Sequence, residues 1–159
     1  MEVSDLLTVE SVISDLRVTS KKQALQEMSR FAASLTGQPE RAIFDVLLER
    51  ERLGTTGVGN GLAIPHGRLS GLDRICGFFA RIEKPIDFES IDDRPVDLIF
   101  LLLAPEGSGA DHLKALARIS RLLRDQSLCE KLRGAHSRDA LYALLSQTPE
   151  SNSSLKAAS

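Results

Sequence analysis

The sequence predicts a single-domain α/β sandwich in which helices flank a few core strands. Its 159 residues are about the length of one domain. Hydrophobic residues make up 42% of the chain, enough for a core of domain size. Apolar residues recur at helical spacing in the first and last thirds, whereas the middle third holds short apolar runs typical of strands. Because helical segments bracket the strands, a layered α/β arrangement is favoured.

Two helices are predicted before the middle third. Apolar residues recur at helical spacing through residues 20–36, where Thr19 or Ser20 can cap the start and Gly37 can close the end. The second helix, residues 39–51, opens with a proline, which suits the first turn of a helix.

Helices are also predicted for the last third of the chain. Residues 111–124 and 128–133 carry apolar residues at helical spacing, and Ser137 can cap a final helix. The folded domain is expected to span residues 1–147. Residues 148–159 are polar and are expected to form a disordered tail.

Three strands are predicted between these helices, at residues 62–64, 74–82 and 96–104. The third is nearly continuous in apolar residues, as expected for a strand covered on both faces. It is far shorter than the ~20 residues that a membrane-spanning helix needs. We therefore expect no insertion into a membrane.

Composition argues against several classes of function. The net charge of -2 gives no general attraction to nucleic acid or to an anionic membrane. There is no Trp and only one Tyr, so stacking platforms for single-stranded nucleic acid are lacking. Cys76 and Cys129 lie in apolar segments and are expected to be buried free thiols, which fits the reducing cytosol. The first ten residues do not resemble a signal peptide, so we expect a cytoplasmic protein.

The chemistry is expected in residues 53–67, which hold five of the eleven glycines. Glycines allow backbone N–H groups to surround an anion, and Thr56 and Asn60 add side-chain donors. His66 follows a short predicted strand and lies between a proline and a glycine, so its outer ring nitrogen should be reachable. A neutral imidazole is a competent nucleophile near neutral pH, because its unperturbed pKa is about 6.5.

Two further side chains can assist transfer of a phosphoryl group to His66. Such catalysis depends mostly on positioning and charge stabilisation. Arg50 ends the predicted helix before the loop, and His112 begins the helix that follows the longest strand. Because strand ends and adjoining helix starts commonly border sites in α/β folds, His112 is expected to face His66.

Each candidate also has a purely structural explanation. His66 can be a surface residue on a glycine-rich turn, and Arg50 can be a cation favoured at a helix C-terminus. His112 can bond to its own backbone, and Thr56 and Asn60 can be turn residues.

Two other kinds of site receive little support. The glycine-rich loop lacks the Lys–Ser/Thr ending of a nucleotide-binding P-loop, and a strand follows it rather than a helix. His66, His112 and Asp111 do not have the compact spacing of metal ligands. We therefore expect neither a metal nor a cofactor.

The stretch Arg50–Gly67, RERLGTTGVGNGLAIPHG, closely resembles the signature of the fructose/mannitol/nitrogen-type enzyme IIA family of the phosphotransferase system. The resemblance extends over roughly residues 6–145. It implies that His66 accepts a phosphoryl group on Nε2 from a phosphorylated HPr-like carrier. It also implies that Arg50 is the active-site arginine and that His112 is the second active-site histidine.

The resemblance implies a fold as well, with a mixed sheet of roughly five strands and helices on both faces. The strands beyond the three above would then come from weak segments such as residues 86–91. The chain has Arg52 and Arg68 where lysine is frequent in the family, and Thr55 where serine is common. These differences keep the charge or the hydroxyl group.

Two functions within the family remain open. The favoured one is a bacterial, nitrogen-regulatory enzyme IIA that binds target proteins according to its phosphorylation state. The alternative is a sugar-transport enzyme IIA that passes the phosphoryl group to an enzyme IIB for fructose or mannitol uptake. Residues 20–25 and 91–98 look like nitrogen-type members, and the sequence carries no attached IIB, IIC or HPr domain. These features favour the regulatory function.

Overall fold

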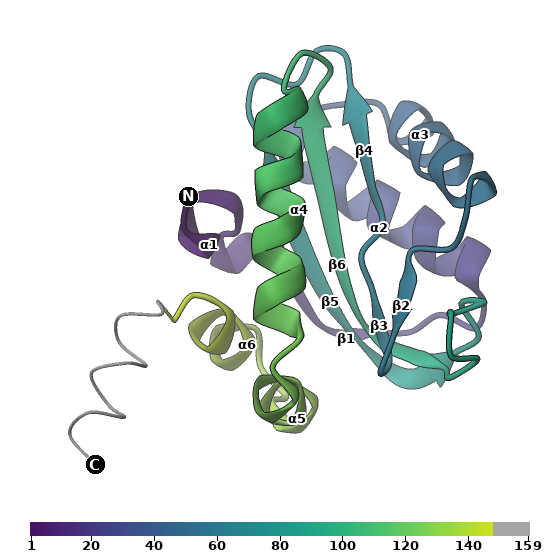
Figure 1. Ribbon diagram of the computed structural model, residues 1–159, viewed down its shortest axis with the longest axis vertical. Coiled ribbons are helices and arrows are strands. Elements are labelled where there is room, and N and C mark those ends of the chain that lie inside the picture. The colour runs from purple at the N-terminus through teal and green to yellow at the C-terminus, as the bar shows by residue number, and fades with distance from the viewer. Residues whose placement is uncertain (148–159) are drawn as a thin grey trace.

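A six-stranded mixed sheet forms the centre of the molecule, and helices lie against both of its faces (Figure 1). The computed structural model describes residues 1–147, so the tail predicted for residues 148–159 lies outside the described residues. The strands are β1 (Val12–Leu16), β2 (Gly57–Gly59), β3 (Leu62–Ala63), β4 (His66–Leu69), β5 (Cys76–Ile86) and β6 (Val96–Pro105). The helices are α1 (Val3–Leu6), the short 3-10 helix η1 (Val9–Ser11), α2 (Lys21–Thr36), α3 (Glu40–Arg52), α4 (Gly109–Leu123), α5 (Gln126–Gly134) and α6 (Arg138–Leu145).

Strand β6 lies in the middle of the sheet. It pairs with the antiparallel β5 on one side and with the parallel β3 and β4 on the other. Every side chain from Leu98 to Ala104 is fully buried. Because successive strand residues point to opposite faces, Phe100 packs into one core and Leu101 into the other. The prediction of a strand covered on both faces is confirmed.

The two cores are covered by different sets of helices. Side chains from α1, α4, α5 and α6 cover one face of the sheet, and side chains from α2 and α3 cover the other. Figure 1 shows α4 in front of the sheet and α2 behind it. The predicted α/β sandwich, with helices on both faces, is therefore confirmed.

The helix ends follow the capping residues in the sequence. The hydroxyl of Ser20 accepts a hydrogen bond from the backbone N–H of Gln23 at the start of α2. Gly37 closes this helix with a φ of 74°, a left-handed conformation that glycine adopts without steric cost. Helices α3, α4, α5 and α6 also match their predicted positions, with ends that differ by one or two residues, whereas α1 and η1 were not predicted.

The strands contain the main differences from the sequence prediction. The sheet has six strands rather than roughly five, and β1, β2 and β4 were not predicted. Residues 86–91 do not form an extra strand, because β5 already ends at Ile86 and Glu89 has a φ of 55°. The expectation of burial holds for Cys129, whereas Cys76 is only partly buried at the start of β5.

Strands β3 and β4 run one after the other along the same edge of β6. In β3, Leu62 pairs with Leu98, and in β4, His66 pairs with Leu102. Between them, the carbonyl of Pro65 accepts a hydrogen bond from the backbone N–H of Leu102. The chain therefore stays bound to β6 on its way to β4, and this pairing fixes the backbone of His66.

The glycine after His66 allows α3 to approach β4 closely. A Cβ atom at Gly67 would overlap the Cγ1 methyl group of Val46 on α3. The sequence argument expected the glycine beside His66 to keep the outer ring nitrogen reachable. In the structure, the missing side chain of Gly67 makes room for Val46 of α3. The same close approach brings the last turn of α3 beside His66.

We expect Gly67→Ala to lower the free energy of unfolding by about 1–3 kcal/mol, because the added methyl group overpacks the contact between α3 and β4. Val46→Ala in the same chain should recover part of this loss, since it removes the overlapping methyl group. Urea unfolding of the two single variants and the double variant measures the coupling. Strictly additive losses would contradict the proposed contact.

Candidate functional site

An open depression of about 460 Å³ lies where the end of α3, the start of β4 and the beginning of α4 meet. Four of its lining side chains carry nitrogen atoms that can interact with an anion: Arg50, His66, Arg68 and His112. Among the strands of residues 1–147, β4 pairs only with β6, so it lies at an edge of the sheet. Helices from both faces therefore reach His66, with α3 on one side and α4 on the other.

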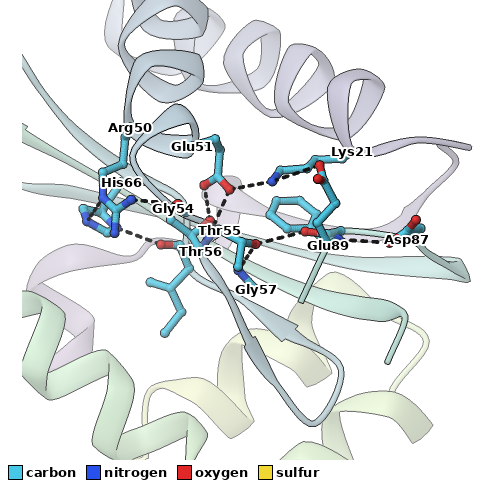
Figure 2. A network of polar contacts seen from close by, with 12 residues as sticks. Lys21, Arg50, Glu51, Gly54, Thr55, Thr56, Gly57, His66, Asp87 and Glu89 are labelled. Carbon is cyan, nitrogen blue, oxygen red and sulfur yellow. Dashed lines mark hydrogen bonds and ion pairs between the residues drawn. The ribbon is translucent and has the colours of Figure 1, made fainter. Parts of the chain in front are cut away.

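The ring of His66 is held in one tautomer. Its Nδ1 lies 2.8 Å from the carbonyl oxygen of Ile64, which can only accept a hydrogen bond (Figure 2). Nδ1 therefore carries the ring proton, and Nε2 carries the lone pair. Nε2 accepts a hydrogen bond from Nε of Arg50 at 3.2 Å. The nitrogen available for nucleophilic attack is thus Nε2, beside a guanidinium group.

The surroundings of His66 favour its neutral, nucleophilic form. Its pKa is lowered from the ordinary histidine value, chiefly because partial burial disfavours the charged ring. The hydrogen bond to Ile64 and the nearby carboxylate of Glu51 raise the pKa, and the positive charge of Arg50 lowers it. Since the net shift is downward, the ring is largely neutral at neutral pH.

Arg50 connects His66 to the glycine-rich loop. It lies in the last turn of α3, and its Nη1 donates a hydrogen bond to the carbonyl of Gly54 at 2.9 Å. Its Nε faces the histidine ring at the same time. The guanidinium group is therefore fixed at two points, next to Nε2 of His66.

The second histidine packs directly against the first. The ring centroids of His66 and His112 lie 5.7 Å apart with an interplanar angle of 73°. Helix α4 starts soon after β6 ends and runs back along the sheet (Figure 1). His112 lies in its first turns. The structure thus brings together the three residues that the sequence singled out as catalytic: Arg50, His66 and His112.

His112 is buried, and its ring nitrogens have different environments. Nδ1 accepts a hydrogen bond from Nε of Arg68 at 3.1 Å. Nε2 is buried and has no hydrogen-bond partner among residues 1–147. Burial lowers the pKa of His112, and the charges of His66 and Arg68 lower it further. His112 is therefore a neutral ring next to the open Nε2 of His66.

Thr56 lies in a buried polar network rather than against His66 (Figure 2). Its backbone N–H donates to Oε1 of Glu51 at 3.0 Å, and its hydroxyl donates to the other oxygen of that carboxylate. The Glu51 side chain is only 4% exposed and pairs with Nζ of Lys21 at 2.9 Å. This network ties the start of α2, the end of α3 and the loop before β2 together.

Asn60 lies in the turn between β2 and β3. Asn60 and Gly61 have φ values of 56° and 79°, the pattern of a type I′ hairpin turn. The backbone of Asn60 donates to Asp92 at 2.9 Å and accepts from Arg133 at 2.7 Å. These contacts hold Asn60 in the turn, and none of its hydrogen bonds within the described part of the chain reaches His66.

Sequence reasoning assigned no role to Glu51 or Arg68, whose side chains contact Thr56 and His112 respectively in the structure. A signal for Glu51 was present, because an acidic residue in the last turn of a helix opposes the helix dipole. The position of Glu51 is explained by its buried ion pair with Lys21 and by the hydrogen bonds that it accepts from the backbone N–H and the hydroxyl of Thr56. Arg68 offered a weaker signal, since alternation along a strand places residues 66 and 68 on the same side.

We expect Glu51→Ala to lower the free energy of unfolding by about 3 kcal/mol, because it leaves Lys21 and the Thr56 N–H without their buried partner. Glu49→Ala on the same helix is the matched control. Its side chain is 69% exposed and pairs with Arg52 on the surface, so the loss should stay within about 0.5 kcal/mol. Chemical unfolding measures both, and equal losses would contradict the importance of the buried carboxylate.

We expect the His66 imidazole to titrate below the ordinary histidine pKa, because burial and Arg50 disfavour the charged ring. Arg50→Met should raise this pKa. The unfolded chain binds the proton more tightly, so the contribution of His66 to stability is complete above the unfolded pKa of about 6.5 and is lost as the pH falls below it. NMR titration of the ring signals measures the pKa directly, and an unchanged value in Arg50→Met would count against the arginine effect.

Comparison with known proteins gives a consistent result. The family model described as phosphoenolpyruvate-dependent sugar phosphotransferase system, EIIA 2, matches residues 5–148. A nitrogen regulatory protein of Bradyrhizobium diazoefficiens is 61% identical over 149 residues, which cover 94% of this chain and 97% of that protein. A fructose-specific EIIA component of the phosphotransferase system of Haloferax volcanii is 34% identical, with coverage of 94% and 100%.

The fold is similar to that of a solved structure. The crystal structure of nitrogen regulatory protein IIA-Ntr from Neisseria meningitidis superposes with a TM-score of 0.85 at 34% sequence identity, and the match covers 90% of this chain and 98% of that one. The resemblance read from the Arg50–Gly67 stretch is therefore confirmed. In the described part of the chain, no helix is both long enough and apolar enough to cross a membrane.

Proposed function

The chain belongs to the EIIA 2 family of the phosphoenolpyruvate-dependent sugar phosphotransferase system, and we propose that it carries a phosphoryl group on Nε2 of His66. The observation that supports this most strongly is the fixed tautomer of His66. Its Nδ1 proton is bound to the carbonyl of Ile64, and its Nε2 lone pair lies in an open depression beside Arg50.

The proposed transfer starts from a phosphorylated HPr-like carrier. The hydrogen bond from Arg50 to Nε2 of His66 is released, Nε2 attacks the phosphorus, and the bond between phosphorus and the carrier breaks as the new P–N bond forms. Positive charge then develops on the His66 ring, and the carbonyl of Ile64 stabilises it through the Nδ1–H. Such a reaction depends on alignment and charge, which a preformed pocket supplies.

Arg50 and His112 would stabilise the phosphoryl oxygens. The Nε of Arg50 bonds the lone pair of Nε2 before transfer, so the guanidinium is already within reach of oxygens attached to that atom. His112 would add a neutral donor without repelling His66. Thr56 would act indirectly, by holding Glu51 and the loop, and Asn60 would shape the hairpin turn.

The rim of the depression suits a protein partner. Leu53 is 81% exposed and Leu113 is 63% exposed, and both line the depression around His66. Exposed apolar side chains around a reactive group are typical of a docking surface. Phosphorylation would add a charge of about -1.5 to -2 at the centre of this surface. A partner that binds the unphosphorylated surface would therefore bind the phosphorylated surface less well, and the reverse.

A regulatory role is the favoured form of this function. The chain is 61% identical to a protein named nitrogen regulatory protein, against 34% to a fructose-specific component. We therefore propose a cytoplasmic bacterial carrier that controls target proteins through its phosphorylation state. The alternative is a sugar-transport enzyme IIA that passes its phosphoryl group to an enzyme IIB.

We expect His66→Ala to abolish labelling of the protein by phosphoenolpyruvate and the upstream carriers, because the acceptor nitrogen is lost. His112→Ala should still be labelled, because it keeps His66, but more slowly, because it loses the proposed donor to the phosphoryl oxygens. His136→Ala is the control, because this exposed histidine contacts Arg81 in another region of the molecule. Rapid-quench labelling gives the rates, and persistent labelling of His66→Ala would overturn the assignment.

The regulatory and transport functions differ in what the labelled protein does next. Phosphorylated and unphosphorylated protein can be used in parallel to capture partners from the source cell. Capture of ion-transport regulators or sensor kinases in only one state would support regulation. Transfer of the label to an enzyme IIB with uptake of fructose or mannitol would support the alternative.

A further inference from the structure

We propose that Arg68 is a positioning residue, which fixes the tautomer of His112 and leaves one free N–H donor, at Nε2, for the phosphoryl group on His66. This inference rests on the proposed function and extends it to a residue outside the three already discussed. It begins from the hydrogen bond between Nε of Arg68 and Nδ1 of His112, at 3.1 Å.

The direction of this hydrogen bond determines where the ring proton lies. A guanidinium group has five N–H donors and no acceptor, and it stays protonated at any physiological pH. Nδ1 of His112 must therefore be the acceptor and carry a lone pair. In a neutral imidazole the proton is then on Nε2.

The resulting N–H donor of His112 has no hydrogen-bond partner within the described residues. Nε2 is buried and forms no hydrogen bond within residues 1–147. Buried donors in native proteins are almost always satisfied, and leaving one free is costly. If an oxygen of the phosphoryl group accepts a hydrogen bond from this N–H, the lack of a partner for Nε2 of His112 is explained.

The location of the two rings fits this explanation. His112 packs edge to face against His66, with centroids 5.7 Å apart. Phosphoryl oxygens on Nε2 of His66 would extend from that ring into the shared depression. The neutral N–H of His112 would donate a hydrogen bond to such an oxygen, in addition to the charge that Arg50 already places beside Nε2 of His66.

The other tautomer would have the opposite effect at both ends of the ring. A proton on Nδ1 would face the N–H donor of Arg68, and the lone pair on Nε2 would face anionic oxygen. Both contacts would be repulsive. Arg68 therefore selects the tautomer that attracts a phosphoryl group, although Arg68 itself contacts the far side of the ring.

The placement of Arg68 follows from the strand that carries the acceptor. Arg68 and His66 are two residues apart in β4, so their side chains leave the same side of the strand. Arg68 pairs in register with Ala104 near the end of β6. The pairing that orients His66 thus orients the side chain that controls His112.

The direct test is nitrogen-15 NMR of the histidine rings in the full chain. We expect His112 in the wild-type protein to show the single tautomer with its proton on Nε2. Arg68→Met should give a mixture of both tautomers, and Arg68→Lys, which keeps a cationic donor, should restore part of the preference. Arg50→Met is the matched control, since Arg50 contacts His66 and should leave the tautomer of His112 unchanged.

The functional test compares rates of phosphoryl transfer. We expect Arg68→Met to slow labelling roughly tenfold, the loss of about one good hydrogen bond. Because Arg68 is proposed to act through His112, the double variant Arg68→Met/His112→Ala should be no slower than His112→Ala alone. A further loss in the double variant would show that Arg68 acts by another route.

The outcomes separate this inference from the proposed function. A single Nε2–H tautomer of His112 in Arg68→Met would overturn the positioning role, whatever the transfer rates. A wild-type protein that cannot be labelled on His66 would overturn the carrier function, whereas the tautomer measurements would still report whether Arg68 controls His112.

Discussion

The site depends on one hydrogen bond, from Nδ1–H of His66 to the carbonyl of Ile64. The two residues are only two positions apart, so the bond is local, but it forms because the chain between them is bound to β6. It decides which ring nitrogen has the lone pair and keeps that nitrogen facing the depression. Arg50 donates a hydrogen bond to that nitrogen, and His112 packs against the same ring.

The surrounding fold brings distant segments to that atom. β6 holds β3 and β4 along one edge, and α4 returns from the end of β6 to place His112. Gly67 lets α3 approach until Arg50 reaches the ring, and the buried Glu51 secures the end of α3. His66, the proposed acceptor, thus lies between α3 and α4, two helices that are far apart in the sequence.

The sequence predicted the helices, the central strand and the three main site residues, because each has a local signal. Ser20 and Gly37 mark helix ends, and the apolar run of β6 marks a buried strand. The short strands could not be predicted in this way. Two of them, β2 and β3, have three and two residues and exist because they pair with each other and with β6. Strands that form through pairing with distant segments are poorly predicted by the β-strand propensity of their own residues.

The contacts of Arg68 and Lys21 could not be predicted for a related reason, because they join residues that are far apart in the sequence. Arg68 bonds a residue 44 positions away, and Lys21 pairs with Glu51 on another helix. The contact between Arg50 and His66 also bears on the proposed role as a phosphoryl carrier. In that role the His66 ring must be neutral before transfer, whereas the phosphorylated ring needs positive charge nearby. Arg50 would meet both requirements, because its charge disfavours protonation of His66 and its guanidinium would attract the phosphoryl oxygens, whereas Arg68 contacts only the second ring.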